Sequence, residues 1–370
     1  MSPNYQARCG KLRRALKKAD FEVDGLIISG LANVRYLTGF TGDSSWLFLN
    51  STSCVLLSDT RYETQLADEC PGLEVEIRDS GSTINDLSAK VVAKAKSRRV
   101  GFEADHMTVA QHSSLSEKMT TATLVATSGL VERLREVKDP WELTQIRAAI
   151  EYAQRGLGVV RSSLRVDQTE TEIRYLLEAA MRSFGANGTG FEPIVGVGPT
   201  AALPHAHAGM RRIAEHAVLL IDWGASTDSG YRSDLTRVFI TGKPTKQMEL
   251  VYNTVLAAQQ AAIKAIRPGV KCADVDKIAR SLIERAGFGK YFGHGLGHGF
   301  GLEIHESVRV SPVSDREFEA GMVVTMEPGI YLPGKFGIRI EDDILVTSDG
   351  NEILSNLERE FDQAIVPILA

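Results

Sequence analysis

The chain has 370 residues, 42 lysines and arginines against 47 aspartates and glutamates, and a formal net charge of −5. This length exceeds what one hydrophobic core usually fills, so two domains are expected, and the balanced charge argues against nucleic acid as a partner. No stretch is apolar enough to span a bilayer or to serve as a signal peptide, which predicts a cytoplasmic protein without a membrane partner.

The chain begins with a basic segment, residues 11–20, in which lysines and arginines alternate with Leu12, Ala15 and Leu16. This spacing predicts an amphipathic helix whose charged face is solvated, rather than a binding patch. Six short apolar runs then alternate with helix-like stretches, and they are residues 24–29, 45–50, 53–59, 73–79, 99–105 and 123–128. The pattern predicts an α/β N-terminal domain over residues 1–130 that carries no site of its own.

The four cysteines are scattered without paired spacing, at positions 9, 54, 70 and 272. None lies beside the histidine-rich segments. They are expected to be reduced and structural, neither a disulfide framework nor a thiolate metal site.

A charged junction at residues 132–135 precedes a second domain, expected over residues 138–370. Its first helix should begin at Asp139-Pro140-Trp141-Glu142, where aspartate is the N-cap, proline the first helical residue and glutamate the third. A second helix is expected from about Thr169 to Gly185, and two more over residues 246–266 and 273–286.

Two acidic hairpins follow these helix pairs. In the first, Asp222 and Asp234 are equidistant from Asp228, which predicts that the two carboxylates lie opposite each other on one face. In the second, Glu327 and Glu341 are equidistant from Gly334, although Pro328-Gly329 is expected to interrupt the first strand. Like charges so placed repel unless a cation lies between them, so a metal site is predicted.

Histidines gather in two loops. His294, His298 and His305 lie on a glycine-rich stretch before the second hairpin, and His205 and His207 lie before the first. A single such histidine is more often hydrogen-bonded and partly buried than a ligand. Four carboxylates and an imidazole together favour a hard or borderline divalent ion such as Mn²⁺, Co²⁺ or Zn²⁺.

The second domain thus repeats one order twice: two helices, a histidine loop and an acidic hairpin. If the repeats pack about a pseudo-twofold axis, both hairpins meet at its centre. Four carboxylates would then converge there, which is where two cations are expected to bind.

Five motifs carry a resemblance: LLIDWGA, GYRSDLTR, GHGLGHGFGLEIHE, MEPGIY and RIEDD, in this order and spacing. They resemble the metal-binding signature of the creatinase, prolidase and aminopeptidase P family. DGLIISGLANVRYLTGFTGDSSWLFL similarly resembles the start of that family's N-terminal domain. The resemblance implies an α+β protein in which a creatinase/prolidase-like N-terminal α/β domain precedes a C-terminal pita-bread catalytic domain with a pseudo-twofold repeat.

The resemblance also implies roles for individual residues. Two divalent metal ions per chain, with manganese the first choice and cobalt or zinc as alternatives, would be held by Asp222, Asp234, His298, Glu327 and Glu341. Asp234 and Glu341 would bridge the ions. The positions that contact substrate or assist catalysis would be His205, His294, His305, Glu327, Tyr331 and Arg339. His207 has no counterpart, and a homodimer is expected.

The expected chemistry is hydrolysis of an Xaa-Pro peptide bond by a hydroxide shared between two ions, with Glu327 as the proton carrier. Release of one N-terminal residue, as in aminopeptidase P, is the first expectation, because no further cation is evident that would bind a dipeptide's carboxylate. The alternatives are an Xaa-Pro dipeptidase (prolidase), a creatinase-like hydrolase and a non-catalytic binding module. Loss of ligands would be expected for the last two.

Overall fold

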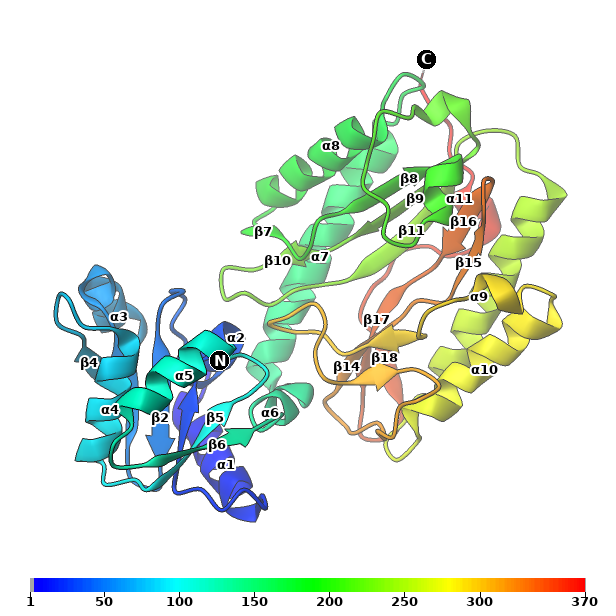
Figure 1. Cartoon of the computed structure of the whole chain (residues 1–370). Coiled ribbons are helices and arrows are strands. Elements are labelled where there is room, and N and C mark those ends of the chain that lie inside the picture. The colour runs from blue at the N-terminus through cyan, green and yellow to red at the C-terminus, as the bar shows by residue number, and fades with distance from the viewer. Residues whose placement is uncertain (1–2, 370) are drawn as a thin grey trace. The chain divides into compact units, whose positions relative to one another are not determined.

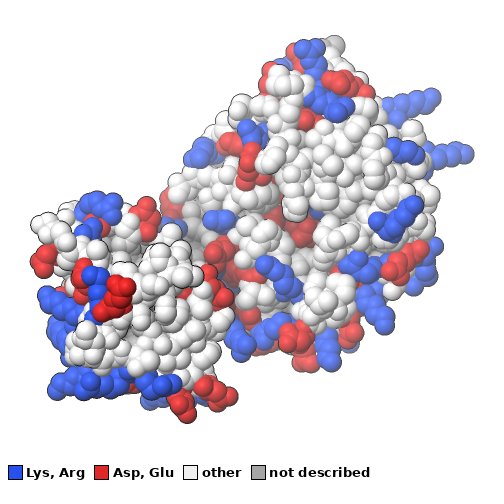
Figure 2. Space-filling model, in the orientation of Figure 1, with Lys and Arg blue, Asp and Glu red and all other residues white. Residues whose placement is uncertain are grey.

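The computed structural model describes residues 3–369, and its internal contacts divide the chain after Arg135. Each of the two units is described by itself below. No helix in the described range is long and apolar enough to cross a membrane. On the face drawn in Figure 2, acidic and basic side chains are interspersed over both units.

The N-terminal unit is one six-stranded mixed sheet with strand order β4-β3-β2-β1-β5-β6. The strands are β1 (Gly25–Ile28), β2 (Trp46–Asn50), β3 (Cys54–Ser58), β4 (Glu74–Ile77), β5 (Arg99–Glu103) and β6 (Thr123–Thr127). All six predicted strands are therefore present. Strands β1, β2 and β3 pair antiparallel, whereas β4, β5 and β6 join the sheet in parallel.

Six helices belong to this part of the chain, and helical segments lie on both sides of the sheet in Figure 1. They are α1 (Tyr5–Lys18), α2 (Leu31–Thr38), α3 (Glu63–Glu69), α4 (Ile84–Lys94), α5 (Val109–Lys118) and α6 (Glu132–Glu136), with the 3-10 turn η1 (Thr60–Tyr62). The basic helix α1 buries Leu12 and Leu16 and leaves Lys11, Lys17 and Lys18 exposed, as predicted.

The C-terminal unit consists of two helix pairs and a set of short sheets between them (Figure 1). Its helices are α7 (Pro140–Ser162), α8 (Glu170–Ser183), α9 (Lys246–Ala265), α10 (Cys272–Arg285) and α11 (Phe361–Ala364), with 3-10 turns η2 (Gly198–Ala202), η3 (Ile213–Glu215) and η4 (Gly289–Tyr291). Helix α7 begins with the predicted capping box, in which Asp139 and Glu142 each accept from the other's backbone N–H. Thr169 and Glu172 cap α8 in the same way.

The strands of this unit form several short sheets. They are β7 (Gly188–Thr189), β8 (Ile194–Val197), β9 (Val218–Trp223), β10 (Ala225–Ser226), β11 (Leu235–Ile240), β12 (Gly297–His298), β13 (Arg309–Val310), β14 (Val323–Met326), β15 (Gly329–Leu332), β16 (Phe336–Arg339), β17 (Asp342–Val346) and β18 (Asn351–Ile353). Apolar side chains from β9, β11, β14 to β17, α9 and α10 form one continuous core. This core fixes the strands that carry the acidic residues.

The second acidic hairpin has the predicted register about Gly334. Leu332 pairs with Phe336 where β15 meets β16, and Met326 pairs with Asp342 where β14 meets β17. Both ladders are therefore centred on Gly334. The strand interruption expected at Pro328-Gly329 is real, because it separates β14 from β15.

The register predicted for the first hairpin is wrong. Asp222 pairs with Thr236 rather than with Asp234, because the hairpin is centred on Ser229 and not on Asp228. Thr227 accepts from Gly230 and donates its N–H to Tyr231, which leaves three residues in the turn. Gly230 has φ +85°, the left-handed conformation typical of a three-residue hairpin loop.

Candidate metal centre

Carboxylates from both hairpins meet inside the C-terminal unit. Asp222 at the end of β9, Asp234 before β11 and Glu341 before β17 each offer an oxygen atom, and these atoms all lie within 4.8 Å of one another. All three residues are nearly inaccessible to solvent. The two halves are joined at this point by a β-bridge between Thr236 and Glu341.

His298 and Glu327 complete the group. The Nε2 atom of His298 lies 3.5 Å from an oxygen of Asp234 and 3.3 Å from an oxygen of Glu327. Thr325 holds both residues, because its Oγ1 accepts from the backbone N–H of His298 and donates to Glu327 across 3.1 Å in each case. All five residues expected to bind metal are thus brought together.

The electrostatics of the cluster show an excess of negative charge. Burial raises the pKa of Asp222, and burial together with the neighbouring carboxylates raises the pKa of both Asp234 and Glu341 well above the usual range. Oδ1 of Asp222 is buried and has no hydrogen-bond partner among the described residues. Burial also acts on Glu327, but hydrogen bonding to His298 and the charges around it lower its pKa to about 2.

This donor set fits a hard divalent cation. Four converging carboxylates and one imidazole nitrogen are the ligands that Mn²⁺, Co²⁺ and Zn²⁺ accept, and a cation would relieve the carboxylate repulsion and provide a partner for Asp222 Oδ1. The residues therefore fit the group that the sequence predicts.

Arg339, Tyr331 and His294 form a chain of hydrogen bonds beside the carboxylates. Arg339 is ion-paired with Asp222 and donates to the Tyr331 hydroxyl across 2.6 Å. That hydroxyl lies 2.9 Å from Nε2 of His294, whose Nδ1 lies 2.7 Å from the carbonyl oxygen of Gly295. Since the carbonyl only accepts, Nδ1 carries the proton and Nε2 accepts from Tyr331. Burial lowers the pKa of His294, in keeping with a neutral ring.

His305 lies against His298, with ring centroids 4.4 Å apart at an interplanar angle of 74°. Burial, followed by the charge of His298, lowers the pKa of His305 to about 4, so its ring is neutral near pH 7. Its loop is anchored by the next residue, because Glu306 pairs with Lys138 across 3.0 Å and both side chains are buried.

A cavity of about 560 Å³ opens over the carboxylates. It is lined by the five metal-ligand candidates, by Arg339 and by the histidines at positions 205, 207, 294 and 305. His207 is largely exposed and has Glu192 as its nearest acidic neighbour, at 3.8 Å. Tyr331 contacts the site through Arg339 and His294 and does not line the cavity itself.

Arg309 also lines this cavity, although no motif in the sequence singles it out. It pairs with His298 in the ladder between β12 and β13, and its exposed side chain donates to the carbonyl oxygen of Glu306 across 2.8 Å. The reason for expecting an aminopeptidase, that no further cation is near the site, is therefore contradicted. Arg309 could have been placed at this site only by knowing that β12 pairs with β13.

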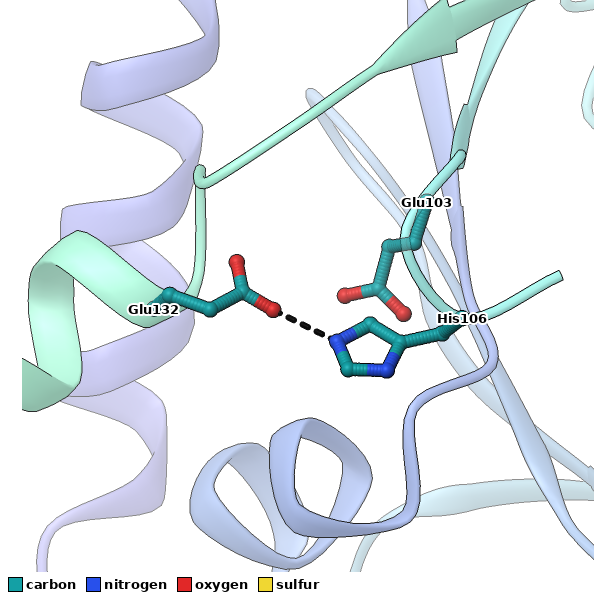
Figure 3. Close-up of side chains that lie close together, drawn as sticks. All are labelled: Glu103, His106 and Glu132. Carbon is teal, nitrogen blue, oxygen red and sulfur yellow. Dashed lines mark hydrogen bonds and ion pairs between the residues drawn. The ribbon is translucent and has the colours of Figure 1, made fainter. Parts of the chain in front are cut away.

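A second group of possible ligands lies in the N-terminal unit and consists of Glu103, His106 and Glu132 (Figure 3). His106 Nε2 lies 2.7 Å from an oxygen of Glu132. The amide nitrogen of Asn33 donates to both glutamates, and its oxygen accepts from Arg135. Because an amide N–H group cannot bind a cation and already occupies the space between the carboxylates, we interpret this group as a structural network.

Comparison with known proteins agrees with this geometry. Residues 144–348 match the model of metallopeptidase family M24, and residues 8–137 match the creatinase/prolidase N-terminal domain. An uncharacterized peptidase of Bacillus subtilis, YqhT, is 36% identical over 339 residues, which are 92% of this chain and 95% of that protein.

Two solved structures are similar over nearly their whole length. The Xaa-Pro dipeptidase from Bacillus anthracis is 35% identical, covers 99% of this chain and 100% of its own, and has a TM-score of 0.92. The X-Pro aminopeptidase from Thermotoga maritima is 34% identical, covers 96% of this chain and 100% of its own, and has a TM-score of 0.86. These matches confirm the predicted fold class and the family resemblance, and this chain belongs to metallopeptidase family M24, with the N-terminal domain of creatinases and prolidases.

Proposed function

We propose that the protein is an Xaa-Pro dipeptidase that depends on two divalent metal ions. The observation that carries the proposal is Arg309, which lines the same cavity as the carboxylate cluster. A dipeptide ends in a free carboxylate directly after proline, and an arginine that faces the cavity can bind it in bidentate fashion. The similarity to the Xaa-Pro dipeptidase from Bacillus anthracis supports this choice.

The metal ions would be held by Asp222, Asp234, His298, Glu327 and Glu341. Ions so held supply a Lewis acid and make water acidic enough to attack near neutral pH. Manganese is the first choice for this oxygen-rich set, and cobalt or zinc are alternatives.

The protein's own residues would orient the substrate and move its proton. Glu327 is ionised at neutral pH, so its carboxylate can take the proton of the attacking water and pass it to the leaving nitrogen of proline. His305 and His205 line the cavity and can donate a hydrogen bond to the carbonyl oxygen of the scissile bond. His294 would act differently from our first expectation, since Tyr331 occupies its Nε2 atom.

A positioning role therefore suits His294 and Tyr331. Together they fix the plane of the Arg339 guanidinium group, which is buried and also donates to Thr236 across 3.2 Å. A proline ring lacks an N–H, so recognition must rely on shape and on groups that bind the carbonyl or carboxylate. Rigid placement of Arg339 would serve that purpose.

An aminopeptidase is the second candidate, and the similarity to the X-Pro aminopeptidase from Thermotoga maritima favours it. The cavity of such an enzyme must leave room for the peptide chain that continues after proline. A creatinase-like hydrolase or a non-catalytic binding module is less well supported, because the full set of metal ligands is present.

Kinetics with Gly-Pro, Gly-Pro-amide and Gly-Pro-Ala test the proposal. A dipeptidase should cleave Gly-Pro at least 10-fold more efficiently, in kcat/KM, than the other two, because a charge-assisted contact with a carboxylate contributes about 1.5–3 kcal/mol. Replacing Arg309 with Met should raise the KM for Gly-Pro and remove this preference. Lys335→Met, at the exposed tip of the second hairpin, is the control for loss of one positive charge. Equal turnover of Gly-Pro and Gly-Pro-Ala by the wild type would identify an aminopeptidase instead.

A further inference from the structure

Two cysteines that are far apart in sequence lie side by side in the N-terminal unit. The Sγ atom of Cys9, on α1, is 3.6 Å from the Sγ atom of Cys54, the first residue of β3. At this distance the two sulfurs share a hydrogen bond. No local pattern in the sequence indicates the pair, because 45 positions separate its members.

The surroundings of the pair favour a thiolate at Cys9. Arg13 follows one turn later on α1, and its guanidinium group donates to the carbonyl oxygens of Asn50 and Ser53 at 2.8 Å and 3.1 Å, next to Cys54. The hydrogen bond from Cys54 lowers the pKa of Cys9, burial opposes this, and the charge of Arg13 lowers it further. The same hydrogen bond and burial raise the pKa of Cys54.

Access to the pair differs between its members. Cys9 is 5% exposed, whereas Cys54 is partly exposed. The pair is therefore closer to solvent on the Cys54 side. Arg8, also on α1, donates to the carbonyl oxygen of Tyr36, and the Cys9 thiol lies 3.6 Å from that of Leu37, so the helix is held where the pair forms.

Neither of the other two cysteines is described with a second thiol as its partner. Cys70 is buried and donates to the carbonyl oxygen of Thr38, and burial raises its pKa to about 11. Cys272 is fully buried in the C-terminal unit, and burial raises its pKa to about 12. They are matched controls within the same chain.

We propose that Cys9 and Cys54 are a peroxide-reactive thiol pair that closes to a reversible disulfide. The Cys9 thiolate attacks one oxygen of hydrogen peroxide, which forms a sulfenic acid and releases hydroxide. The Cys54 sulfur then attacks the Cys9 sulfur, its proton and the sulfenic hydroxyl leave as water, and the hydroxide takes up the proton given by Cys9. Two thiols and one peroxide thus become one disulfide and two waters.

The disulfide would tie α1 to the sheet. A disulfide bond is about 2.0 Å long, so the two sulfurs must approach by about 1.5 Å, which side-chain rotation and a small shift of α1 can supply. Closing a loop of this length restricts the unfolded chain. Oxidation should therefore raise the thermal midpoint of the N-terminal unit, and a thiol reductant should reverse the change.

The test uses the full-length, metal-loaded protein treated with increasing hydrogen peroxide and then alkylated under denaturing conditions. We expect two of the four thiols to be lost at peroxide concentrations that leave the other two alkylated, and a peptide linking Cys9 to Cys54 to appear in the mass spectrum. Dithiothreitol should restore both thiols. Cys70→Ser and Cys272→Ser should behave as the wild type does.

Single variants distinguish the thiol that reacts with peroxide, Cys9, from the thiol that then closes the disulfide, Cys54. In Cys54→Ser, Cys9 should become labelled by a cyclic 1,3-diketone that traps sulfenic acids, whereas in Cys9→Ser labelling of Cys54 should be at least several-fold weaker. The proposal is overturned if all four thiols survive peroxide that oxidises free cysteine, or if Cys9 is oxidised to sulfinic acid without forming the linked peptide. Preferential oxidation of Cys70 or Cys272 would overturn it too.

Discussion

Thr236 and Glu341 join the two halves of the catalytic unit. The Thr236 hydroxyl donates to a Glu341 oxygen across 2.6 Å, and the Glu341 N–H donates to the Thr236 carbonyl oxygen across 3.2 Å. The same hydroxyl accepts from Arg339. One side chain therefore orients both an expected metal bridge and the guanidinium group beside it.

Thr236→Val should weaken metal binding by about 10- to 100-fold, the usual effect of removing a group that orients a ligand. Glu341 would lose its hydrogen bond but keep its place in the fold. Thr236→Ser retains the hydroxyl and should bind metal nearly as the wild type does. Titration of the metal-stripped proteins with Mn²⁺, followed by calorimetry, measures the difference, and equal affinities for Val and Ser would show that the hydroxyl is irrelevant.

Treatment with a chelator should abolish hydrolysis of Xaa-Pro peptides, and Mn²⁺ or Co²⁺ should restore it, because the buried carboxylates need a compensating charge. Elemental analysis is expected to find two ions per chain. Asp234→Asn should lower the metal content by more than one ion, since this carboxylate is expected to bridge both. Undiminished activity in chelator, with no metal found, would refute the assignment.

Replacing His298 and replacing His294 should have different effects. His298→Ala removes a nitrogen ligand and should lower metal occupancy. His294→Ala should leave the metal content unchanged and lower kcat, because Tyr331 and Arg339 lose the partner that fixes them. Elemental analysis and steady-state kinetics on both variants check this, and equal loss of metal in the two would contradict it.

The buried pair of Lys138 and Glu306 should be important for stability. Lys138→Met removes the buried ammonium group that pairs with the Glu306 carboxylate, which should cost about 3–5 kcal/mol in the free energy of unfolding. The control is Arg147→Met, which breaks an exposed pair with Glu352 and should cost less than about 1 kcal/mol. Urea unfolding of both variants gives the two values. A loss below 1 kcal/mol for Lys138→Met would show that Glu306 takes up a proton or finds another partner.

Acid should selectively remove the contribution of Glu132 to the N-terminal unit. Burial raises the pKa of this carboxyl group, but hydrogen bonds from His106 and Asn33 outweigh it and lower the pKa from 4.5 to about 2. A lowered pKa stabilises the folded state above pH 4.5, and this contribution disappears as the pH falls towards 2. The shift corresponds to about 3 kcal/mol at most.

Glu132→Gln should therefore be less stable than the wild type at pH 7, and the two should converge near pH 2 in urea titrations. Glu74→Gln, on the exposed edge strand β4, is the control and should differ from the wild type by less than about 0.5 kcal/mol throughout. A constant difference between Glu132→Gln and the wild type from pH 7 to pH 2 would contradict the prediction. Glu103 should affect the pH dependence of stability in the opposite direction, since burial raises the pKa of its carboxyl group.

Local signals in the sequence were sufficient for much of the fold. The capping box at Asp139, the helix start near Thr169 and the hairpin centred on Gly334 depend on neighbours a few residues apart, and all were predicted correctly. The five metal-ligand candidates were identified because charges within apolar strands are costly, and the structure brings them together.

Features that depend on packing were not predictable. The register of Asp222 depends on whether the hairpin is centred on Asp228 or on Ser229, and composition alone does not decide this. Arg309 enters the cavity only because its short strand pairs with the one that carries His298. Cys9 and Cys54 meet because α1 packs near the start of β3, a contact across 45 positions.

The ion pair between Arg339 and Asp222 gives the catalytic unit an internal counter-ion. Part of the carboxylate charge is therefore neutralised by the chain itself. Arg339 contacts one oxygen of Asp222 and leaves Oδ1 without a partner, so a divalent ion bound at Oδ1 would add to this ion pair rather than replace it.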